Sequence, residues 1–176
     1  MTVRWSALVL LVSLVAGACG AAAADGPPDI QYGRDICVQC NMIISEVGHA
    51  AAYRLDDGTE KLFDGVGEMV LHGRELDEFD RAEAWVHDYS TEEWVAADEA
   101  FYVPTLAVGT PMGHGIFAFA DRTRAEEFAS EVGGEVIEWA TVLLLPIVDG
   151  RVGSIHEDAG DTEHDDMDGN ETEGEG

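Results

Sequence analysis

Apolar and polar positions between residues 50 and 63 follow a pattern that predicts a hairpin of two strands. Ala50–Leu55 is a short run dominated by Ala, Tyr and Leu, and Glu60–Phe63 is the returning run. The intervening Asp56-Asp57-Gly58 is typical of a tight turn between paired strands. We therefore expect an antiparallel pair at the start of the folded region.

The next segment predicts a helix and a third strand. Asp64 is a candidate N-cap, and Val66, Met69 and Val70 would share one helix face. Arg81–Tyr89 then alternates in the manner of a strand. Residues 50–90 are thus expected to run strand, strand, helix, strand.

The same order of elements recurs in the second half of the chain. Phe101–Val108 and Gly115–Ala120 are predicted strands, and Thr123-Arg124-Ala125-Glu126 is typical of a capping box. Apolar residues three and four apart predict a helix that ends at Gly133-Gly134, and Glu135–Leu145 is predicted to be a closing strand. The expected fold class is α+β, with two tandem small ββαβ units packed together.

The N-terminus is typical of an export signal. Arg4 precedes the apolar run Trp5–Val15, which is too short for a comfortable membrane span, and Ala16-Gly17-Ala18 leads to Cys19. Small residues before a Cys are typical of a lipoprotein signal, so Cys19 is the predicted lipidation site. Ordinary cleavage after Ala18 is the alternative, because Ala16-Gly17-Ala18 also fits a signal-peptidase site.

Composition divides the rest of the chain. The expected parts are a signal peptide (1–18), a lipid anchor and tether (19–30), a first unit (31–90), a linker (91–100), a second unit (101–148) and an acidic disordered tail (149–176).

The balance of charge excludes one class of partner. Nine Lys and Arg face 36 Asp and Glu, which gives a formal net charge of −27. Such a surface repels phosphate backbones, so we expect no nucleic-acid partner. Acidic excess with few Lys is typical of salt-loving microbes, and a haloarchaeal source is the simplest interpretation.

Cys37-Val38-Gln39-Cys40-Asn41-Met42 is the stretch most able to carry chemistry. A structural zinc site would require a second pair of ligands, and a thioredoxin-like pair would follow a strand and open a helix. An exported chain could also join the two cysteines in an inert disulfide. The fourth interpretation is a soft-metal site, because thiolate and thioether sulfur are the ligands that Cu(I) prefers.

A second group of soft donors lies in the second unit. Met112 and His114 flank Gly113 in a loop between two predicted strands, where Met112 has no obvious core to fill. Ligands from corresponding loops of a repeated fold could converge on one ion. We find no nucleophile elbow, phosphate-binding loop or paired catalytic carboxylates, so we expect no enzyme activity.

These motifs resemble the NosL family of accessory proteins of nitrous oxide reductase. The likeness extends over about residues 31–139 and is carried by the following elements: Cys37-x-x-Cys40-x-Met42, Phe63-Asp64 before a helix with Met69, Pro111-Met112-Gly113, Phe119-Ala120-Asp121-Arg122, Ala125, Phe128 and Gly133-Gly134-Glu135-Val136.

The resemblance implies a lipoprotein on the outer face of the membrane that binds Cu(I). It implies a copper acceptor such as nitrous oxide reductase as partner, together with an ABC-type maturation complex. Cys40, Met42 and Met112 would then hold Cu(I), with Cys37 and His114 as exchange or accessory ligands. The alternative function is a membrane-anchored thiol-disulfide oxidoreductase that uses Cys37 and Cys40.

Overall fold

The computed structural model describes residues 26–148 and 151–153. The predicted signal peptide and Cys19 lie outside this range, as does the predicted tail apart from residues 151–153. In the described part of the chain, no helix is both long and apolar enough to cross a membrane.

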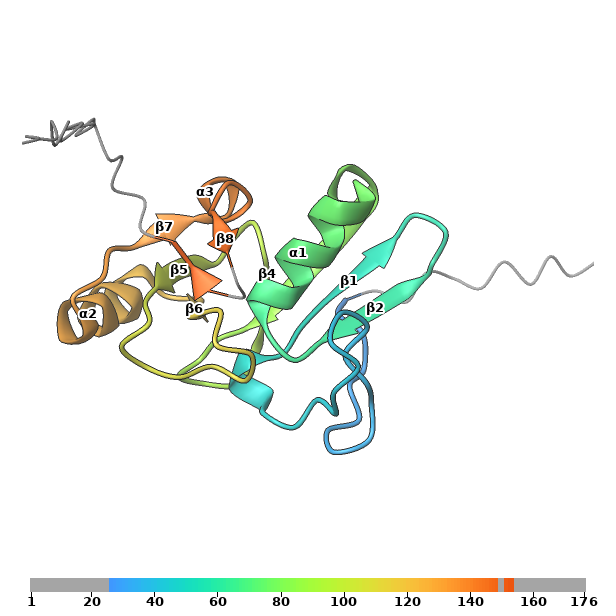
Figure 1. Ribbon diagram of the computed structural model, residues 1–176, viewed down its shortest axis with the longest axis horizontal. Coiled ribbons are helices and arrows are strands. Elements are labelled where there is room, and N and C mark those ends of the chain that lie inside the picture. The colour runs from blue at the N-terminus through green and yellow to red at the C-terminus, as the bar shows by residue number, and fades with distance from the viewer. Residues whose placement is uncertain (1–25, 149–150, 154–176) are drawn as a thin grey trace, which may run out of the picture.

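The first unit is a four-stranded antiparallel sheet in the order β2-β1-β3-β4 (Figure 1). β1 (Ala51–Leu55) lies between β2 (Glu60–Phe63) and β3 (Ala82–His87), and β4 (Trp94–Ala96) pairs with the outer side of β3. α1 (Val66–Leu76) connects β2 to β3. Every residue of β1 is buried, as expected for a central strand covered on both faces.

The second unit repeats this topology in a smaller, three-stranded sheet. β5 (Phe101–Pro104) lies between β6 (Ile116–Phe119) and β7 (Ile137–Glu138), and α2 (Arg122–Val132) connects the last two. The order β6-β5-β7 matches β2-β1-β3, and all these pairs are antiparallel. The predicted fold of two tandem ββαβ units is therefore confirmed.

Shorter elements complete the chain. Two 3-10 turns, η1 (Val47–His49) and η2 (Phe79–Arg81), precede strands of the first sheet. α3 (Trp139–Val142) follows β7, and β8 (Ile147–Val148) pairs with β9 (Arg151–Val152). Arg151 and Val152 were expected in the acidic tail, but they are part of the fold, and Val152 is buried.

The predicted closing strand Glu135–Leu145 is wrong beyond its first residues. β7 covers only Ile137–Glu138, and α3 begins at Trp139. Val142 and Leu145 are fully buried, and the ring of Trp139 packs against that of Tyr102. Inward positions three residues apart are typical of a helical turn, and the polar residues Glu135, Glu138 and Thr141 have the same spacing, which the strand prediction overlooked.

The predicted linker 91–100 contains β4, so it belongs to the first sheet. Trp94 pairs with His87, and Ala96 pairs with Trp85. The indole of Trp94 lies 3.7 Å, centroid to centroid, from the imidazole of His87. Pairing with β3 and this ring contact make part of the predicted linker an edge strand.

The two helices predicted from the sequence, α1 and α2, begin at different residues than expected. α1 begins at Val66 with Gly65 as its N-cap, and no side chain caps it. α2 has Asp121 as its N-cap, two residues before the expected Thr123, and Asp121 Oδ1 accepts from the backbone N–H of Arg124 at 3.0 Å. The end of α2 was predicted correctly, since Gly133 adopts the left-handed conformation with φ 73°.

One hydrophobic core joins the two units. Tyr53, Phe63 and Met69 from the first unit share a cluster with Tyr102 and Leu145 from the second. α1 contacts β1 and β2 of its own sheet and also β6 of the other sheet. The first turn of α1 therefore lies near the junction of the two units.

The buried carboxylate of Asp88 accepts hydrogen bonds from both units. Its Oδ2 accepts from the backbone N–H of Ala120 at 2.7 Å, and its Oδ1 accepts from those of Ser90 at 2.7 Å and Thr91 at 2.9 Å. Burial acts to raise the pKa of Asp88, but these hydrogen bonds outweigh it and lower the pKa. A charged Asp88 thus stabilises the connection between β3 and the second unit.

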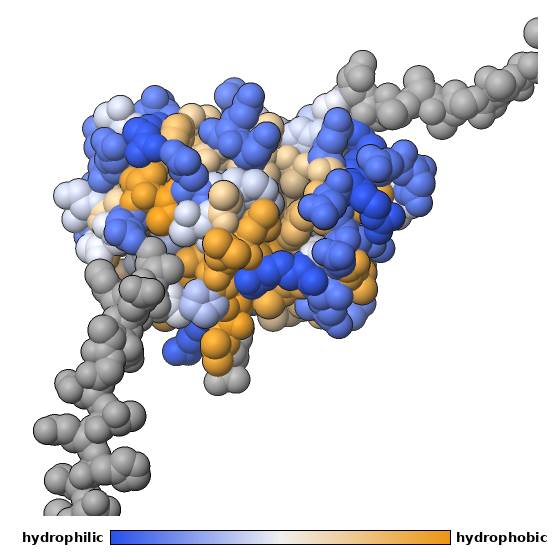
Figure 2. Space-filling view, turned by 90° about the horizontal axis from the view of Figure 1, so that it is seen from above, coloured by the Kyte–Doolittle hydropathy of each residue, from blue (hydrophilic) through white to orange (hydrophobic). Residues whose placement is uncertain are grey.

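The surface is polar over much of the face in Figure 2, where apolar residues gather in a band across the middle. Exposed large apolar side chains also occur in succession around the cysteines, at Ile36, Val38, Met42 and Ile43. The loop that carries the candidate ligands therefore presents apolar rather than charged groups to solvent.

Candidate metal centre

A short hydrogen-bonded loop holds the two cysteines. Ile36 and Ile43 form an isolated antiparallel bridge, and the backbone N–H of Cys37 donates to the carbonyl of Met42 at 2.9 Å. Asn41 closes the turn by donating to the carbonyl of Cys37 at 3.0 Å, with a left-handed φ of 60°. Asn tolerates this conformation better than most residues, which explains its place after Cys40.

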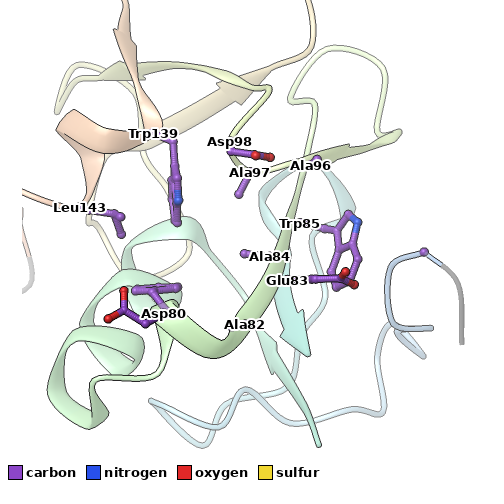
Figure 3. Close-up of a pocket in the computed structure, with 12 residues that line it drawn as sticks. Asp80, Ala82, Glu83, Ala84, Trp85, Ala96, Ala97, Asp98, Trp139 and Leu143 are labelled. Atoms are coloured by element: carbon purple, nitrogen blue, oxygen red, sulfur yellow. The ribbon is translucent and has the colours of Figure 1, made fainter. Parts of the chain in front are cut away.

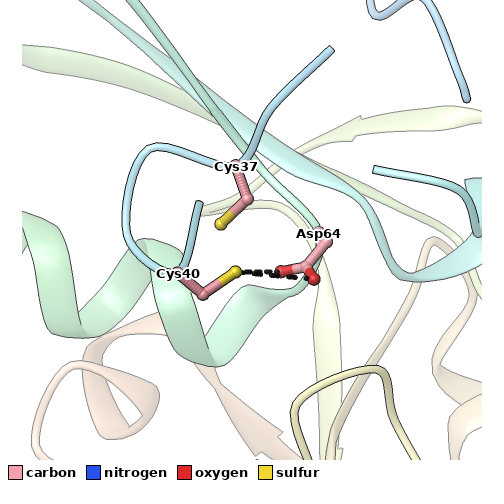
Figure 4. A group of neighbouring side chains, drawn as sticks. All are labelled: Cys37, Cys40 and Asp64. Carbon is pink, nitrogen blue, oxygen red and sulfur yellow. Dashed lines mark hydrogen bonds between the residues drawn. The ribbon is translucent and has the colours of Figure 1, made fainter. Parts of the chain in front are cut away.

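The two thiols meet the carboxylate of Asp64. Ligand atoms of Cys37, Cys40 and Asp64 all lie within 4.8 Å of one another (Figure 4). Cys40 Sγ is 3.6 Å from Asp64 Oδ1 and 3.7 Å from Oδ2. Both cysteines are free; Cys37 is fully buried and Cys40 is half-buried. Two sulfur donors and one oxygen donor could thus contact one cation.

The surroundings of the thiols keep them protonated when no cation is present. Burial raises the pKa of Cys37 to about 12. Burial also raises the pKa of Cys40, and the carboxylates of Asp64 and Glu68 raise it further. Reactive redox thiols have lowered pKa values, commonly at the start of a helix, whereas this pair lies in a turn.

The loop of Met112 and His114 packs against the first turn of α1. Gly113 and Gly115 have φ values of 75° and 69°, which lets the chain reverse there. Met112 and His114 line a small cavity together with Gly67 and Glu68. A Cβ on Gly67 would lie 2.3 Å from Cγ of His114, so only glycine admits the imidazole at this point.

His114 and Glu68 form a buried pair across the junction of the units. His114 Nδ1 lies 3.3 Å from Glu68 Oε2, with the side chains 8% and 2% exposed. Burial raises the pKa of Glu68, His114 acts to lower it, and Asp64 acts to raise it. Glu68 therefore interacts with both the thiol cluster and the second-unit loop.

The structure places the predicted ligands around one end of α1. Cys37 and Cys40 lie beside Asp64, which directly precedes this helix, and His114 lies on its first turn. Met42 is 53% exposed and Met112 is 36% exposed, so both thioethers are open to solvent. His114 is not part of the cluster that the two thiols form with Asp64, because its ring nitrogens do not lie within 4.8 Å of all three ligand atoms.

Sequence reasoning missed two acidic residues of the site. Asp64 was assigned to helix capping, although Gly65 directly after it is the N-cap. Glu68 lies between residues of the buried helix face, and the flanking Gly65 and Gly67 were its available signal. Neither acid stands out among 36 Asp and Glu without the fold.

A separate open cavity of about 580 Å³ lies over β3 and β4. Trp85 and Trp139 stand on opposite sides of it, with Ala84, Ala96 and Ala97 between them (Figure 3). Its lining contains no Cys, His or Met. The soft donors of the described residues therefore gather at the first turn of α1 rather than in this cavity.

Fold and site define a two-unit α+β protein with a sulfur-rich candidate metal centre near the junction of its units. The sequence profile of the NosL family matches residues 31–143, and the chain belongs to this family. The match includes both candidate ligand loops.

A solved structure has the same fold. The crystal structure of the copper chaperone NosL from Shewanella denitrificans superposes with a TM-score of 0.59 at 20% sequence identity. The similarity covers 65% of this chain and 93% of that protein. A search of curated proteins gave no significant match.

Proposed function

We propose that this protein is an extracytoplasmic Cu(I) chaperone that carries the ion to a copper enzyme. The observation that carries the proposal is the convergence of Cys37, Cys40 and Asp64 at the start of α1, where Met112 and His114 also pack. Membership of the NosL family and the fold shared with a copper chaperone support the same function.

Cu(I) fits this donor set better than Zn(II) does. Thiolate, thioether and imidazole are soft or borderline ligands, and Cu(I) accepts two or three of them without rigid geometry. A structural zinc site ordinarily has four Cys or His ligands in a closed tetrahedron. Cys40, Met42 and Met112 are our proposed principal ligands, with Cys37 and His114 as exchange or accessory ligands.

Charge and exposure suit uptake and release of a cation. A thiol that binds Cu(I) gives up its proton, and the cation compensates the thiolate charge that burial otherwise disfavours. The exposed thioethers of Met42 and Met112 leave the ion open to attack by ligands of a partner. Transfer could therefore proceed through shared coordination, without release of free copper.

The redox alternative is less consistent with the thiols. A thiol-disulfide oxidoreductase requires a thiolate at neutral pH, whereas the pKa of Cys37 is about 12 and that of Cys40 is raised. Metal binding removes this obstacle, because the ion itself displaces the proton.

The acceptor and the membrane anchor are further parts of the proposal. Nitrous oxide reductase is the proposed copper acceptor, reached with an ABC-type maturation complex, and lipid on Cys19 would hold the protein at the outer face of the membrane. The mass of the mature chain isolated from membranes tests the anchor. A mature chain that begins at Cys19 without lipid would contradict it.

Competition with a colourimetric Cu(I) chelator tests the binding proposal. The reduced protein should bind about one Cu(I) per chain, and Met42→Leu and Met112→Leu should each weaken binding because they remove a soft donor at nearly constant volume. Met69→Leu is the matched control, since Met69 is fully buried in the core. If Met42→Leu and Met112→Leu both bind like wild type, the thioether ligands are wrong.

A further inference from the structure

Glu68 is an acidic residue on the buried side of α1. It is 2% exposed, and its neighbours Val66, Met69 and Val70 are equally buried. Within the described residues, Oε1 of Glu68 is buried and has no hydrogen-bond partner. Burying a carboxylate without full compensation destabilises a fold, so packing alone does not explain this residue.

The surroundings of Glu68 are shaped around its contact with His114. A Cβ on Gly65 would lie 2.8 Å from Glu68 Oε2, and one on Gly67 would lie 2.3 Å from Cγ of His114. These two glycines open a slot that holds the carboxylate and the imidazole side by side. The backbone of His114 is fixed too, because its carbonyl accepts from the N–H of Val152 in β9 at 3.1 Å.

We infer that Glu68 is a positioning residue that orients the His114 imidazole for metal binding. Its Oε2 lies 3.3 Å from Nδ1 of His114, where it accepts a hydrogen bond from Nδ1–H, so that Nε2 stays unprotonated and can bind the metal. Histidine ligands commonly donate their other ring N–H to a carboxylate, which fixes tautomer and orientation. The inference rests on the proposed function, in which His114 is a ligand of Cu(I).

When it is ionised, Glu68 has a second effect on the pair. A carboxylate on Nδ1–H makes Nε2 a stronger donor than a neutral acceptor would. The interaction also crosses from the first unit to the second, because Glu68 belongs to α1 and His114 to the loop before β6. Glu68 would thereby couple the second-unit ligand to the helix that follows Asp64.

Histidine ¹⁵N NMR of the copper-free, reduced protein at pH 8 tests the orientation. We expect His114, assigned by its loss in His114→Phe, to carry its proton on Nδ1. Glu68→Gln should keep this tautomer because its amide oxygen still accepts, whereas Glu68→Leu should lose it. Retention of the Nδ1–H tautomer in Glu68→Leu would overturn the inference.

Cu(I) affinity, measured by chelator competition, tests the consequence for binding. Glu68→Leu should weaken binding about 10- to 100-fold, the usual effect of removing an outer-shell partner, and Glu68→Gln should weaken it less. In the His114→Phe background, Glu68→Leu should have a much smaller effect, because only the charge of Glu68 near Cys40 then remains to be lost. An equal loss in both backgrounds would overturn the inference.

Two further outcomes separate this inference from the proposed function. If the wild type binds copper and Glu68→Leu binds it equally well, the positioning role is wrong and the chaperone proposal stands. If the wild type itself does not bind Cu(I), the proposed function fails. Thermal unfolding of Glu68→Leu gives a structural control, because a role in stability alone would lower Tm, whereas we expect Tm to be unchanged or higher.

Discussion

The two ββαβ units have the same topology but begin their helices differently. In each unit an Asp follows the second strand of the hairpin, Asp64 after β2 and Asp121 after β6. Asp121 caps its own helix by accepting from the N–H of Arg124 at 3.0 Å. Asp64 instead faces Cys40, and α1 begins at Val66, with Gly65 as its N-cap and no side-chain cap.

This difference separates a helix start that is stabilised by its own cap from one whose Asp faces the candidate metal centre. An N-cap side chain stabilises a helix by about 1 kcal/mol, so the first unit forgoes a contribution that the second retains. The first turn of α1 has Gly65, Gly67 and the buried Glu68, whereas that of α2 has Arg122 and Arg124 in exposed positions. The first helix thus places its acidic groups at the candidate metal centre.

The largest expected effect is the loss of copper affinity when a thiol ligand of the first unit is replaced. Cys40→Ser replaces a soft donor by a hard one, and we expect a loss of more than about 100-fold, beyond the roughly 10- to 100-fold typical of outer-shell changes. Chelator competition under reducing conditions measures it. If Cys40→Ser binds Cu(I) as tightly as wild type, the thiol cluster does not bind the copper.

The second largest expected effect is on stability, through loss of the hydrogen bonds by which Asp88 connects the two units. Asp88→Asn removes the buried carboxylate that accepts from the backbone N–H groups of Ala120 and Ser90, and we expect it to lower the free energy of unfolding by about 1–3 kcal/mol. Urea unfolding at neutral pH measures the change.

The pH dependence provides a control for the Asp88 variant. Because the folded pKa of Asp88 is lowered, its contribution is complete above the ordinary Asp value of about 3.9 and is lost as the pH falls through the folded pKa. The difference between wild type and Asp88→Asn should therefore shrink in acid. A difference that grows below that pH would contradict the assignment.

The smallest expected effects are those of replacing Asp64 and Asp121, the two Asp residues at corresponding positions before α1 and α2. Asp121→Ala should cost about 1 kcal/mol of stability through loss of the cap and leave Cu(I) affinity unchanged. Asp64→Ala should cost less stability and weaken copper binding. Parallel urea unfolding and chelator competition on both variants measure this contrast, and equal effects of the two variants would show that the two helix starts are equivalent.

The periodic segments of the fold could be predicted from the sequence. The β1–β2 hairpin and the end of α2 were visible because turn residues separate regular apolar patterns. The closing strand was wrong because the apolar and β-branched residues of Glu135–Leu145 were given more weight than the three-residue spacing of Glu135, Glu138 and Thr141. β4 was missed because only its pairing with β3 makes Trp94–Ala96 a strand.

The candidate ligands could be predicted from the sequence where their residue types are rare in this chain. Few residues of this chain are Cys or Met, so Cys37, Cys40 and Met112 were conspicuous. Asp64 and Glu68 were not, because an acid among 36 acids becomes meaningful only when the fold places it beside a thiol or an imidazole. The sequence thus indicated the soft donors, and the fold added the carboxylates.

Loops from both units are proposed to bind one copper ion. X-ray absorption at the copper edge, on protein loaded with one equivalent of Cu(I), is the direct test of this shared site. We expect Cys40→Ser in the first unit and Met112→Leu in the second each to remove a sulfur scatterer from the same single copper. A first coordination shell in Met112→Leu identical to that of wild type would contradict a shared site and leave the first-unit loop to bind copper alone.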